Sequence, residues 1–162
     1  MHDAGVYDRI ILSTDSTEIA DVAKEYGVEA PFVRPDILSS DEANAHDAIV
    51  HALKWIESND KIYDYVQYVF PTAPLRTSED FLNGIKILTE RDADMVISVC
   101  KTDHPSQWMN ILPDNHSLRD FVKPEYRKKN KQVLEGTYRI NGSIYVAKWS
   151  VFYNDLDWLE QN

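Results

Sequence analysis

Hydrophobic and polar positions along this chain form two repeating patterns, apolar runs and helical stripes. Four apolar runs, at residues 8–14, 30–33, 65–70 and 94–101, have the length and composition of strands buried in a sheet. Apolar residues at helical spacing occupy the stretches between them and predict three helices. Strand and helix therefore alternate, and this order predicts an α/β fold with a mostly parallel sheet and right-handed crossovers.

The three helical stripes have clear limits. The first carries Ile19, Val22 and Tyr26 on one amphipathic face and ends before a glycine, which is a common helix terminator. The second covers residues 44–58 and the third covers residues 78–90.

The stretch from residue 65 to residue 80 combines a buried strand, a stiff loop and a helix start. Two prolines prevent the strand from continuing, and hydroxyl side chains just before the helix can cap its first turn. In open α/β sheets ligands bind at the carboxyl ends of the strands, which is where we expect Thr72 and Arg76 to lie. The alternative is a well-capped connection that binds no ligand.

The chain loses this regularity after Thr102. Residues 104–137 contain three prolines, scattered aromatic residues and no clear period. Two interpretations stay open for this segment: an excursion from the sheet that docks on another subunit, or a mobile arm. Residues 139–148 return to a strand pattern, and residues 149–159 predict one or two short helices.

The composition narrows the classes of partner. The 162 residues are enough for one domain with a substantial core, and the net charge of −10 argues against nucleic acid as a partner. No apolar run approaches the ~20 residues of a membrane span, and the amino terminus lacks the plan of a signal peptide, so we expect no membrane partner. Cys100 is the only cysteine, which favours the reducing cytoplasm.

Basic side chains are concentrated in one part of this acidic chain. The basic group consists of Lys123, Arg127, Lys128, Lys129, Lys131 and Arg139. A polyanionic ligand needs such a positive surface, although solvated lysines on a long polar segment are the alternative. Arg34 follows a predicted strand, as Thr72 and Arg76 do, and guanidinium groups suit phosphate and carboxylate oxygens. The pattern therefore predicts one pocket for an anionic ligand.

Several common chemistries lack their motifs. His46 and His51 are five positions apart, whereas two metal ligands on one helix face need a spacing of about four. We therefore predict no zinc site. The sequence contains no nucleophile elbow, no P-loop and no dinucleotide-binding glycine motif, which argues against hydrolases, P-loop NTPases and typical NAD enzymes.

Four stretches resemble, in the same order, the motifs of the acylneuraminate cytidylyltransferases. They are residues 8–35, residues 38–53, FPTAPLRTSEDF at 70–81 and TYRINGSIYV at 137–146. The resemblance implies a single domain over residues 1–162 with a Rossmann-like three-layer α/β sandwich of the nucleotide-diphospho-sugar transferase type. It also implies a reaction of CTP with a sialic-acid-like nonulosonic acid that gives a CMP-sugar and pyrophosphate, with Mg²⁺ required.

The resemblance also assigns residues to the substrate site. On the cytidine side it places Arg34 and the loop residues Ser40, Ala43 and Ala45. In and after the central strand it places Phe70, Thr72 and Arg76. Beside the sugar acid it places Gln132, Asn141, Gly142 and Tyr145, with Lys131 and Arg139 as the catalytic side chains.

The chain departs from the family pattern at three of these positions. Phe70 stands where the family commonly has a glutamine, Ala45 replaces a frequent serine, and Lys131 replaces an arginine. A lysine cannot hold a carboxylate bidentately as an arginine does. The glycine-rich triphosphate loop and the acidic metal-binding segment of the family are not evident, so we expect this chain to lack both and to be truncated at both ends.

The resemblance implies a homodimer, because residues 104–137 resemble the dimerisation excursion of the family. Without the triphosphate loop, we expect the chain alone to be weakly active or inactive. The alternative function is a non-catalytic remnant that dimerises or binds a sugar acid. A third possibility is a sugar-nucleotide transferase for another base or for a related acid such as legionaminate.

Overall fold

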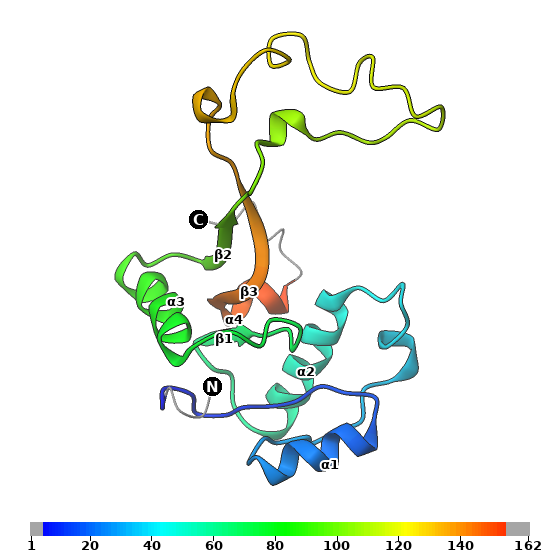
Figure 1. Ribbon diagram of the computed structural model, residues 1–162. Helices are drawn as coiled ribbons and strands as arrows, with labels where there is room; N and C mark the ends of the chain where they lie inside the picture. The colour runs from blue at the N-terminus through cyan, green and yellow to red at the C-terminus, as the bar shows by residue number, and fades with distance from the viewer. Residues whose placement is uncertain (1–4, 155–162) are drawn as a thin grey trace. The chain divides into compact units, whose positions relative to one another are not determined.

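The computed structural model describes residues 5–154, which form two compact units. The first unit contains residues 5–97 and 142–154, and the second contains Ser98–Asn141. Figure 1 shows the elements in chain order. They are α1 (Thr17–Glu25), η2 (Asp36–Leu38), α2 (Ala45–Asn59), β1 (Tyr65–Tyr68), α3 (Ser78–Glu90), β2 (Met95–Lys101), η3 (Ser106–Trp108), η4 (Lys131–Val133), β3 (Tyr138–Lys148) and α4 (Trp149–Tyr153).

The strands form one sheet in the order β1-β3-β2. β1 and β3 are antiparallel, with Tyr65 opposite Lys148 and Tyr68 opposite Tyr145. The strands predicted from the last two apolar runs and from residues 139–148 are confirmed as β1, β2 and β3. α1, α2 and α3 likewise confirm the three predicted helices to within a few residues.

The segment before α1 pairs with the segment that follows α1. This pairing is an isolated parallel bridge between Ile11 and Glu29. The strands predicted at residues 8–14 and 30–33 are wrong, because the first is reduced to the bridge residue and the second contains no strand residue. Pro31 has no N–H to donate to a ladder, which explains why pairing stops after Glu29. A mostly parallel sheet stays a prediction.

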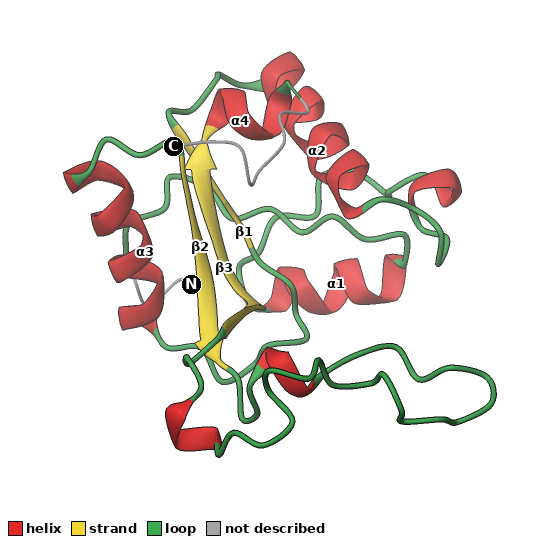
Figure 2. Cartoon of the chain, turned by 90° about the horizontal axis from the view of Figure 1, so that it is seen from above, coloured by secondary structure: helices red, strands yellow, loops and turns green. Residues whose placement is uncertain are grey.

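The side chains of β3 face two layers of helices. Val146 belongs to a buried cluster with Phe81 and Leu88 of α3, whereas the next residue, Ala147, belongs to a cluster with Leu53 of α2. Successive residues of a strand point to opposite faces of a sheet. α3 therefore covers one face, and α2 with α4 covers the other, as Figure 2 shows. The result is an α/β/α layering.

Gly84 lets α3 approach the sheet closely. A Cβ atom at this position would lie 3.0 Å from Cγ2 of Ile144 and 3.5 Å from Cγ1 of Val146. Most real Cβ contacts are longer than the first of these distances. A larger residue in place of Gly84 would have to push the helix or the Ile144 side chain aside.

The amphipathic face predicted for α1 is exposed. Ile19, Val22 and Tyr26 are 54%, 51% and 74% exposed, and Ala20 is the buried residue of the helix. The periodicity thus identified the helix correctly, but the described residues provide no element that covers its apolar face.

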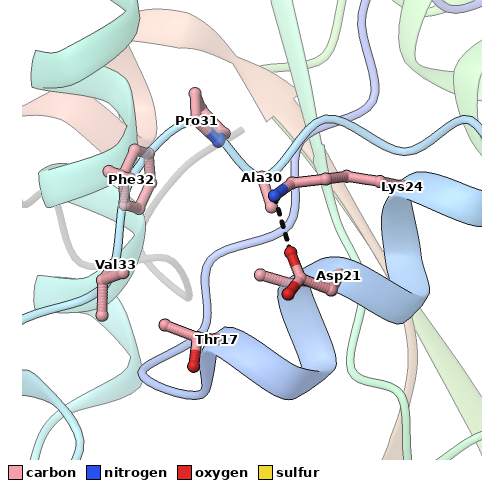
Figure 3. A pocket seen from close by; sticks show the side chains of 8 residues that line it. Thr17, Asp21, Lys24, Ala30, Pro31, Phe32 and Val33 are labelled. Carbon is pink, nitrogen blue, oxygen red and sulfur yellow. Dashed lines mark hydrogen bonds and ion pairs between the residues drawn. The ribbon is translucent and has the colours of Figure 1, made fainter.

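A shallow hollow lies between α1 and the segment that follows Glu29. Its lining, seen in Figure 3, consists of Thr17, Ala20, Asp21, Lys24, Ala30, Pro31, Phe32 and Val33. The ion pair between Lys24 and Asp21, at 2.8 Å, lies along it. None of the residues that we assigned to the substrate site lines this hollow.

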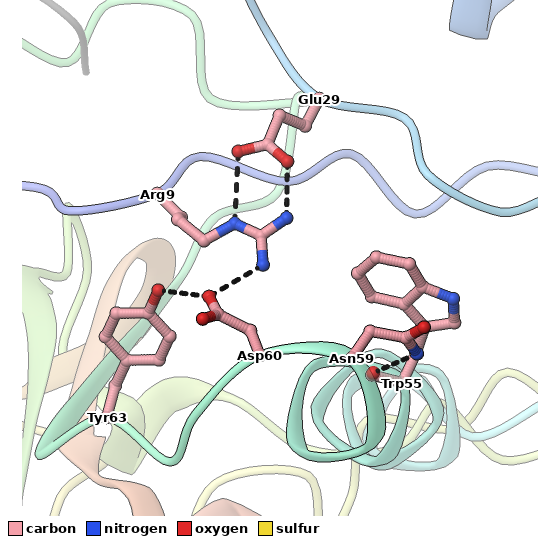
Figure 4. Close-up of polar contacts among 6 residues, drawn as sticks. All are labelled: Arg9, Glu29, Trp55, Asn59, Asp60 and Tyr63. Carbon is pink, nitrogen blue, oxygen red and sulfur yellow. Dashed lines mark hydrogen bonds and ion pairs between the residues drawn. The ribbon is translucent and has the colours of Figure 1, made fainter.

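Arg9 joins three separate parts of the first unit. Its guanidinium makes two hydrogen bonds to Glu29, one of them 3.1 Å from Nε to Oε1, and Nη1 lies 2.9 Å from Oδ2 of Asp60 (Figure 4). Tyr63 donates its hydroxyl to the same Asp60 oxygen at 2.6 Å. The guanidinium also lies 5.7 Å from the ring centroid of Trp55. The chain before α1 is thereby attached to the end of α2.

The second unit is mostly loop. At its base the N–H of Thr102 donates to the carbonyl of Thr137 at 2.9 Å, and their hydroxyls lie 2.7 Å apart. Several large apolar side chains in it are more than half exposed, namely Met109, Ile111, Leu112, Leu118 and Val133. The second unit includes residues 104–137. The role of these residues as a dimerisation excursion stays a prediction. The part of the predicted terminal helices beyond α4 lies outside the described residues.

Candidate functional site

Arg76 fixes the loop between β1 and α3. Its Nη1 donates to the carbonyl of Ser143 in β3 at 2.8 Å, and its Nη2 donates to the carbonyl of Phe70. The ring of Phe81 lies against the guanidinium, 5.7 Å from Cζ to the ring centroid. Burial lowers the pKa of Arg76 because water is partly excluded from its charge. The side chain therefore supports the loop from within.

A capping box ends this loop and starts α3. The N–H of Asp80 donates to the hydroxyl oxygen of Thr77 at 3.3 Å, and the N–H of Thr77 donates to the Asp80 carboxylate at 2.8 Å. The backbone N–H of Thr77, followed by its hydroxyl, lowers the pKa of Asp80. The predicted cap is thus confirmed, and Thr72 lies exposed on the loop before it.

Three aromatic rings meet where β1 ends. The ring of Phe70 lies 4.6 Å from that of Tyr68 and 5.9 Å from that of Tyr145, both at steep interplanar angles. Tyr68 and Tyr145 face each other across the β1–β3 pairing, with ring centroids 6.3 Å apart. All three side chains are half-buried.

Arg34 belongs to the same unit as these rings. Its N–H donates to the carbonyl of Thr14 at 2.7 Å, which holds the backbone, and its Nε donates to Oγ of Ser39 at 2.9 Å. Nη2 lies 3.6 Å from a carboxylate oxygen of Asp15. Burial raises the pKa of Tyr68, and the positive charge of Arg34 opposes that rise. The guanidinium is therefore close enough to Tyr68 to interact with it electrostatically.

The predicted base-reading loop is a tight turn that leads into α2. The N–H of Ala43 donates to the carbonyl of Ser40 at 3.0 Å, and Asn44 caps the helix by accepting from the N–H of His46 at 3.0 Å. Ala45 is the first residue of α2. Ser40 is exposed, whereas Ala43 and Ala45 are half-buried.

The two predicted catalytic side chains belong to the second unit. Lys131 and Arg139 are exposed, as is Gln132. Nζ of Lys131 donates to the carbonyl of Asp103, so the start of η4 is attached to the chain that follows β2. Lys131 and Arg139 present positive charge to solvent within their own unit.

Asn141 and Gly142 lie in β3, at the boundary between the two units. The hydroxyl of Ser98 donates to Oδ1 of Asn141 at 2.6 Å. Gly142 has a φ of +73°, a left-handed conformation that glycine adopts without the steric penalty of a Cβ atom.

Three of the predicted site residues therefore lie together in the first unit: Phe70, Arg76 and Tyr145. Arg34 belongs to the same unit and interacts electrostatically with Tyr68. A single pocket that also includes Lys131, which belongs to the second unit, stays a prediction. Sequence reasoning missed Tyr68. Its position two residues before Phe70 in the predicted strand at residues 65–70 predicts a shared face, and this signal could have identified it.

Two kinds of feature are absent from residues 5–154. No group of three or more His, Cys, Asp or Glu side chains is placed there to hold a metal ion. No helix in the same range combines the length and the apolar character that crossing a membrane requires.

Comparison with known proteins identifies a matching family and several similar proteins. The sequence model of the cytidylyltransferase family matches residues 1–133. The chain is similar to pseudaminic acid cytidylyltransferase of Campylobacter jejuni, with 30% identity over 98% of this chain and 66% of that protein. It is also similar to N-acylneuraminate cytidylyltransferase of Escherichia coli, with 31% identity over 88% of this chain and 32% of that protein.

A third relative is the CMP-N,N′-diacetyllegionaminic acid synthase of Legionella pneumophila, with 30% identity over 86% of this chain and 60% of that protein. The chain thus spans at most 66% of the length of these three relatives.

Proposed function

Because this chain belongs to the cytidylyltransferase family, we propose that it is a nucleotidyltransferase that joins CTP to a nonulosonic acid and releases pyrophosphate. The similar proteins are named for pseudaminic, N-acylneuraminic and N,N′-diacetyllegionaminic acids, which supports this class of acceptor. The observation that carries the proposal is the grouping of Phe70, Arg76 and Tyr145 where β1 ends, in the same compact unit as Arg34.

The proposal includes the Rossmann-like fold of nucleotide-diphospho-sugar transferases with a mostly parallel sheet. The parallel bridge between Ile11 and Glu29 and the α/β/α layering around β3 support it. An antiparallel strand such as β3 is compatible with an otherwise parallel sheet of this kind.

In the proposed reaction the anomeric hydroxyl of the sugar acid attacks the α-phosphorus of CTP. An oxygen–phosphorus bond forms, the bond to the pyrophosphate oxygen breaks, and the hydroxyl proton is released. Such a transfer depends on positioning the two substrates and on positive charge near the phosphate oxygens, more than on covalent chemistry by the protein.

The proposed roles follow from the chemistry of each group. Arg34, held by Ser39, lies on the nucleoside side, and the turn from Ser40 to Ala43 presents backbone groups to the base. Lys131 and Arg139 supply cations for the carboxylate of the sugar acid. Arg76 has a supporting role, because the hydrogen bonds described for its guanidinium end on backbone carbonyls.

Mg²⁺ belongs to the proposal only as a property of the family. When bound to CTP, the ion neutralises the triphosphate and helps orient the leaving group. The described residues do not form a site for it, because they contain no cluster of three acidic or metal-ligating side chains. The residue roles given above are therefore independent of the metal.

A homodimer built through residues 104–137 is also part of the proposal. The exposed apolar side chains of the second unit, such as Ile111 at 88% and Val133 at 69%, support an interface there. We further propose a cytoplasmic location, in which Cys100 stays reduced.

Pyrophosphate release from CTP, with each of the three acids supplied in turn and Mg²⁺ present, tests the proposed activity. We expect release with at least one acid. We expect Arg34→Ala to abolish that release and Arg91→Ala, an exposed arginine at the end of α3, to leave it unchanged.

Other outcomes of the same assay separate the alternatives. Binding of an acid by calorimetry without any turnover would favour a non-catalytic sugar-acid-binding module. Equal release from UTP or GTP would assign the chain to transferases of another base.

A further inference from the structure

Ser39 lies one turn after Arg34 and connects its side chain to the backbone. The N–H of Ser39 donates to the carbonyl of Asp36 at 2.9 Å, which closes the turn η2. This turn brings the Ser39 hydroxyl within 3.1 Å of the Pro35 carbonyl and within 2.9 Å of Nε of Arg34. Both side chains are half-buried. Ser39 is not among the residues that the family resemblance assigns to the site.

Chemistry fixes the direction of these two hydrogen bonds. A guanidinium N–H can only donate, and a carbonyl oxygen can only accept. A hydroxyl has one hydrogen, so the hydroxyl of Ser39 donates to the Pro35 carbonyl while its oxygen accepts from Nε of Arg34. The result is a chain of hydrogen bonds from Arg34 to the backbone, in which each bond polarises the next. An alanine in place of Ser39 would remove both bonds.

The two terminal nitrogens of Arg34 stay available to a ligand. In the part of the chain that the structure describes, neither Nη1 nor Nη2 makes a hydrogen bond, and Nη2 has an ion-pair distance of 3.6 Å to Asp15. The Asp15 carboxylate is half-exposed, so this pair is weak. Because a guanidinium is planar, a bond that holds Nε also restricts the directions in which both terminal nitrogens point.

We propose that Ser39 is a positioning residue that orients the Arg34 guanidinium for binding CTP. This inference rests on the proposed function, because it requires that Arg34 contacts the nucleotide. Without the Ser39 hydroxyl the guanidinium rotates about its flexible stem, and CTP has to order it on binding. A hydrogen bond of this kind corresponds to about a 10-fold change in affinity.

The first test compares CTP and sugar-acid binding by isothermal titration calorimetry of the full chain, with Mg²⁺ present. Ser39→Ala should weaken CTP binding about 10-fold and change the affinity for an N-acylneuraminic acid by less than about 2-fold. The acid is expected beside Lys131 and Arg139, so only a general structural defect would weaken both ligands. Ser39→Thr keeps a hydroxyl at this position and should bind CTP nearly as the unaltered chain does.

The second test follows the Nε–H group of Arg34 in the free chain by heteronuclear NMR, with Arg34→Lys to identify its signal. A hydrogen that is donated to a protein oxygen exchanges slowly with water. Its exchange should become about 10-fold faster in Ser39→Ala, and Ser39→Thr should keep it slow.

Ser58→Ala is the matched control. The Ser58 hydroxyl also donates to the carbonyl four residues earlier, that of Lys54, at 2.9 Å, but it accepts from no arginine within residues 5–154. This variant should leave the CTP affinity and the Arg34 exchange rate unchanged, and circular dichroism confirms folding of each variant. An unchanged CTP affinity in Ser39→Ala would overturn the inference. So would equal weakening of CTP and the acid, or an unchanged exchange rate at Arg34.

The failure of the proposed function has a different signature. If Ser39→Ala weakens CTP binding selectively but the unaltered chain releases no pyrophosphate with any acid, the transferase activity is refuted and the positioning role stands. If pyrophosphate is released and Ser39→Ala binds CTP as tightly as the unaltered chain, the activity stands and the positioning role is refuted. A chain that does not bind CTP would refute both.

Discussion

The Nη1 group of Arg76 donates a 2.8 Å hydrogen bond to the carbonyl oxygen of Ser143, a residue 67 positions later in the chain. The same guanidinium donates to the carbonyl of Phe70, two residues after the end of β1. One side chain thus connects the loop between β1 and α3 to the middle of β3. Phe70 also contributes its ring to the cluster with Tyr68 and Tyr145.

Replacing Arg76 should destabilise the fold. Arg76→Met leaves the carbonyls of Phe70 and Ser143 without these donors, and hydrogen bonds to a charged group contribute about 1.5–3 kcal/mol each to stability in favourable cases. We expect a loss of about 2 kcal/mol in the free energy of unfolding for Arg76→Met, and about half of that for Arg76→Lys, which can reach one carbonyl. Urea unfolding measures both.

Arg91→Met is the control for this prediction. Arg91 is exposed at the end of α3, and its replacement should change the free energy of unfolding by less than about 0.5 kcal/mol. Equal effects of the Arg76 and Arg91 substitutions would contradict a supporting role for Arg76.

Gly84→Ala should destabilise the protein although alanine is the better helix former. Helix propensity favours alanine by about 1 kcal/mol. Overpacking against Ile144, which is only 5% exposed, costs about 1–3 kcal/mol, so the net loss should be about 1 kcal/mol. Thermal unfolding of Asn83→Ala, on the exposed side of the same helix, provides the comparison. That variant should be neutral or slightly stabilising, and a stabilised Gly84→Ala variant would show that the helix can shift freely.

The Arg9 network should make stability depend on pH in the acid range. The hydrogen bond from Arg9 is the main cause that lowers the pKa of Glu29, and the hydrogen bond from Tyr63, followed by that from Arg9, lowers the pKa of Asp60. A carboxyl group with a lowered folded-state pKa stabilises the fold above its unfolded pKa, about 4, and this contribution disappears as the pH falls through the folded value. Stability should therefore decline below about pH 5.

Urea midpoints between pH 7 and pH 3 measure this decline. Arg9→Met should flatten the profile by removing the partner of Glu29, and Tyr63→Phe should do so by acting on Asp60. Both carboxylates are partly exposed, so added salt should weaken the effect. A profile that Arg9→Met leaves unchanged would show that the network contributes nothing measurable.

Lys131 should affect the sugar acid and not the nucleotide, if its proposed role is correct. Lys131→Ala removes a cation expected to face the carboxylate and should weaken acid binding about 10-fold. Lys131→Arg should tighten it, because a guanidinium can hold a carboxylate with two parallel hydrogen bonds. Calorimetry with the acid and with CTP separates the two effects. Lys128→Ala, a neighbouring exposed lysine, should change neither affinity.

Local sequence patterns predicted most helices and strands, because the interactions that start and end these elements lie within a few residues of one another. The prolines after β1 and the capping residues Thr77 and Asp80 define the loop and the start of α3 through backbone chemistry within a few residues. The helical spacing of Ile19, Val22 and Tyr26 identified α1 for the same reason. It could not show that this face stays exposed, because exposure depends on which other elements are present.

Residues 8–14 and 30–33 show the limit of such patterns. Both segments are apolar enough for strands, but a strand exists only where a partner supplies hydrogen bonds over several residues, and the observed pairing is the single bridge at Ile11 and Glu29. Sequence patterns were limited in the same way at the candidate site. In the sequence Arg76 has the charge and hydrogen-bond donors of an anion-binding residue, whereas in the fold it donates to two backbone carbonyls.

The sequence by itself determined the helices, the loop that follows β1, the family and a set of candidate site residues, since these depend on short-range backbone preferences and on residue order. Only the tertiary structure decided that β3 runs antiparallel to β1, that the rings of Tyr68, Phe70 and Tyr145 meet, and that Arg76 donates to the carbonyl of Phe70. The physical reason is that these relationships depend on contacts between residues far apart in the chain, and no local preference specifies which distant groups meet.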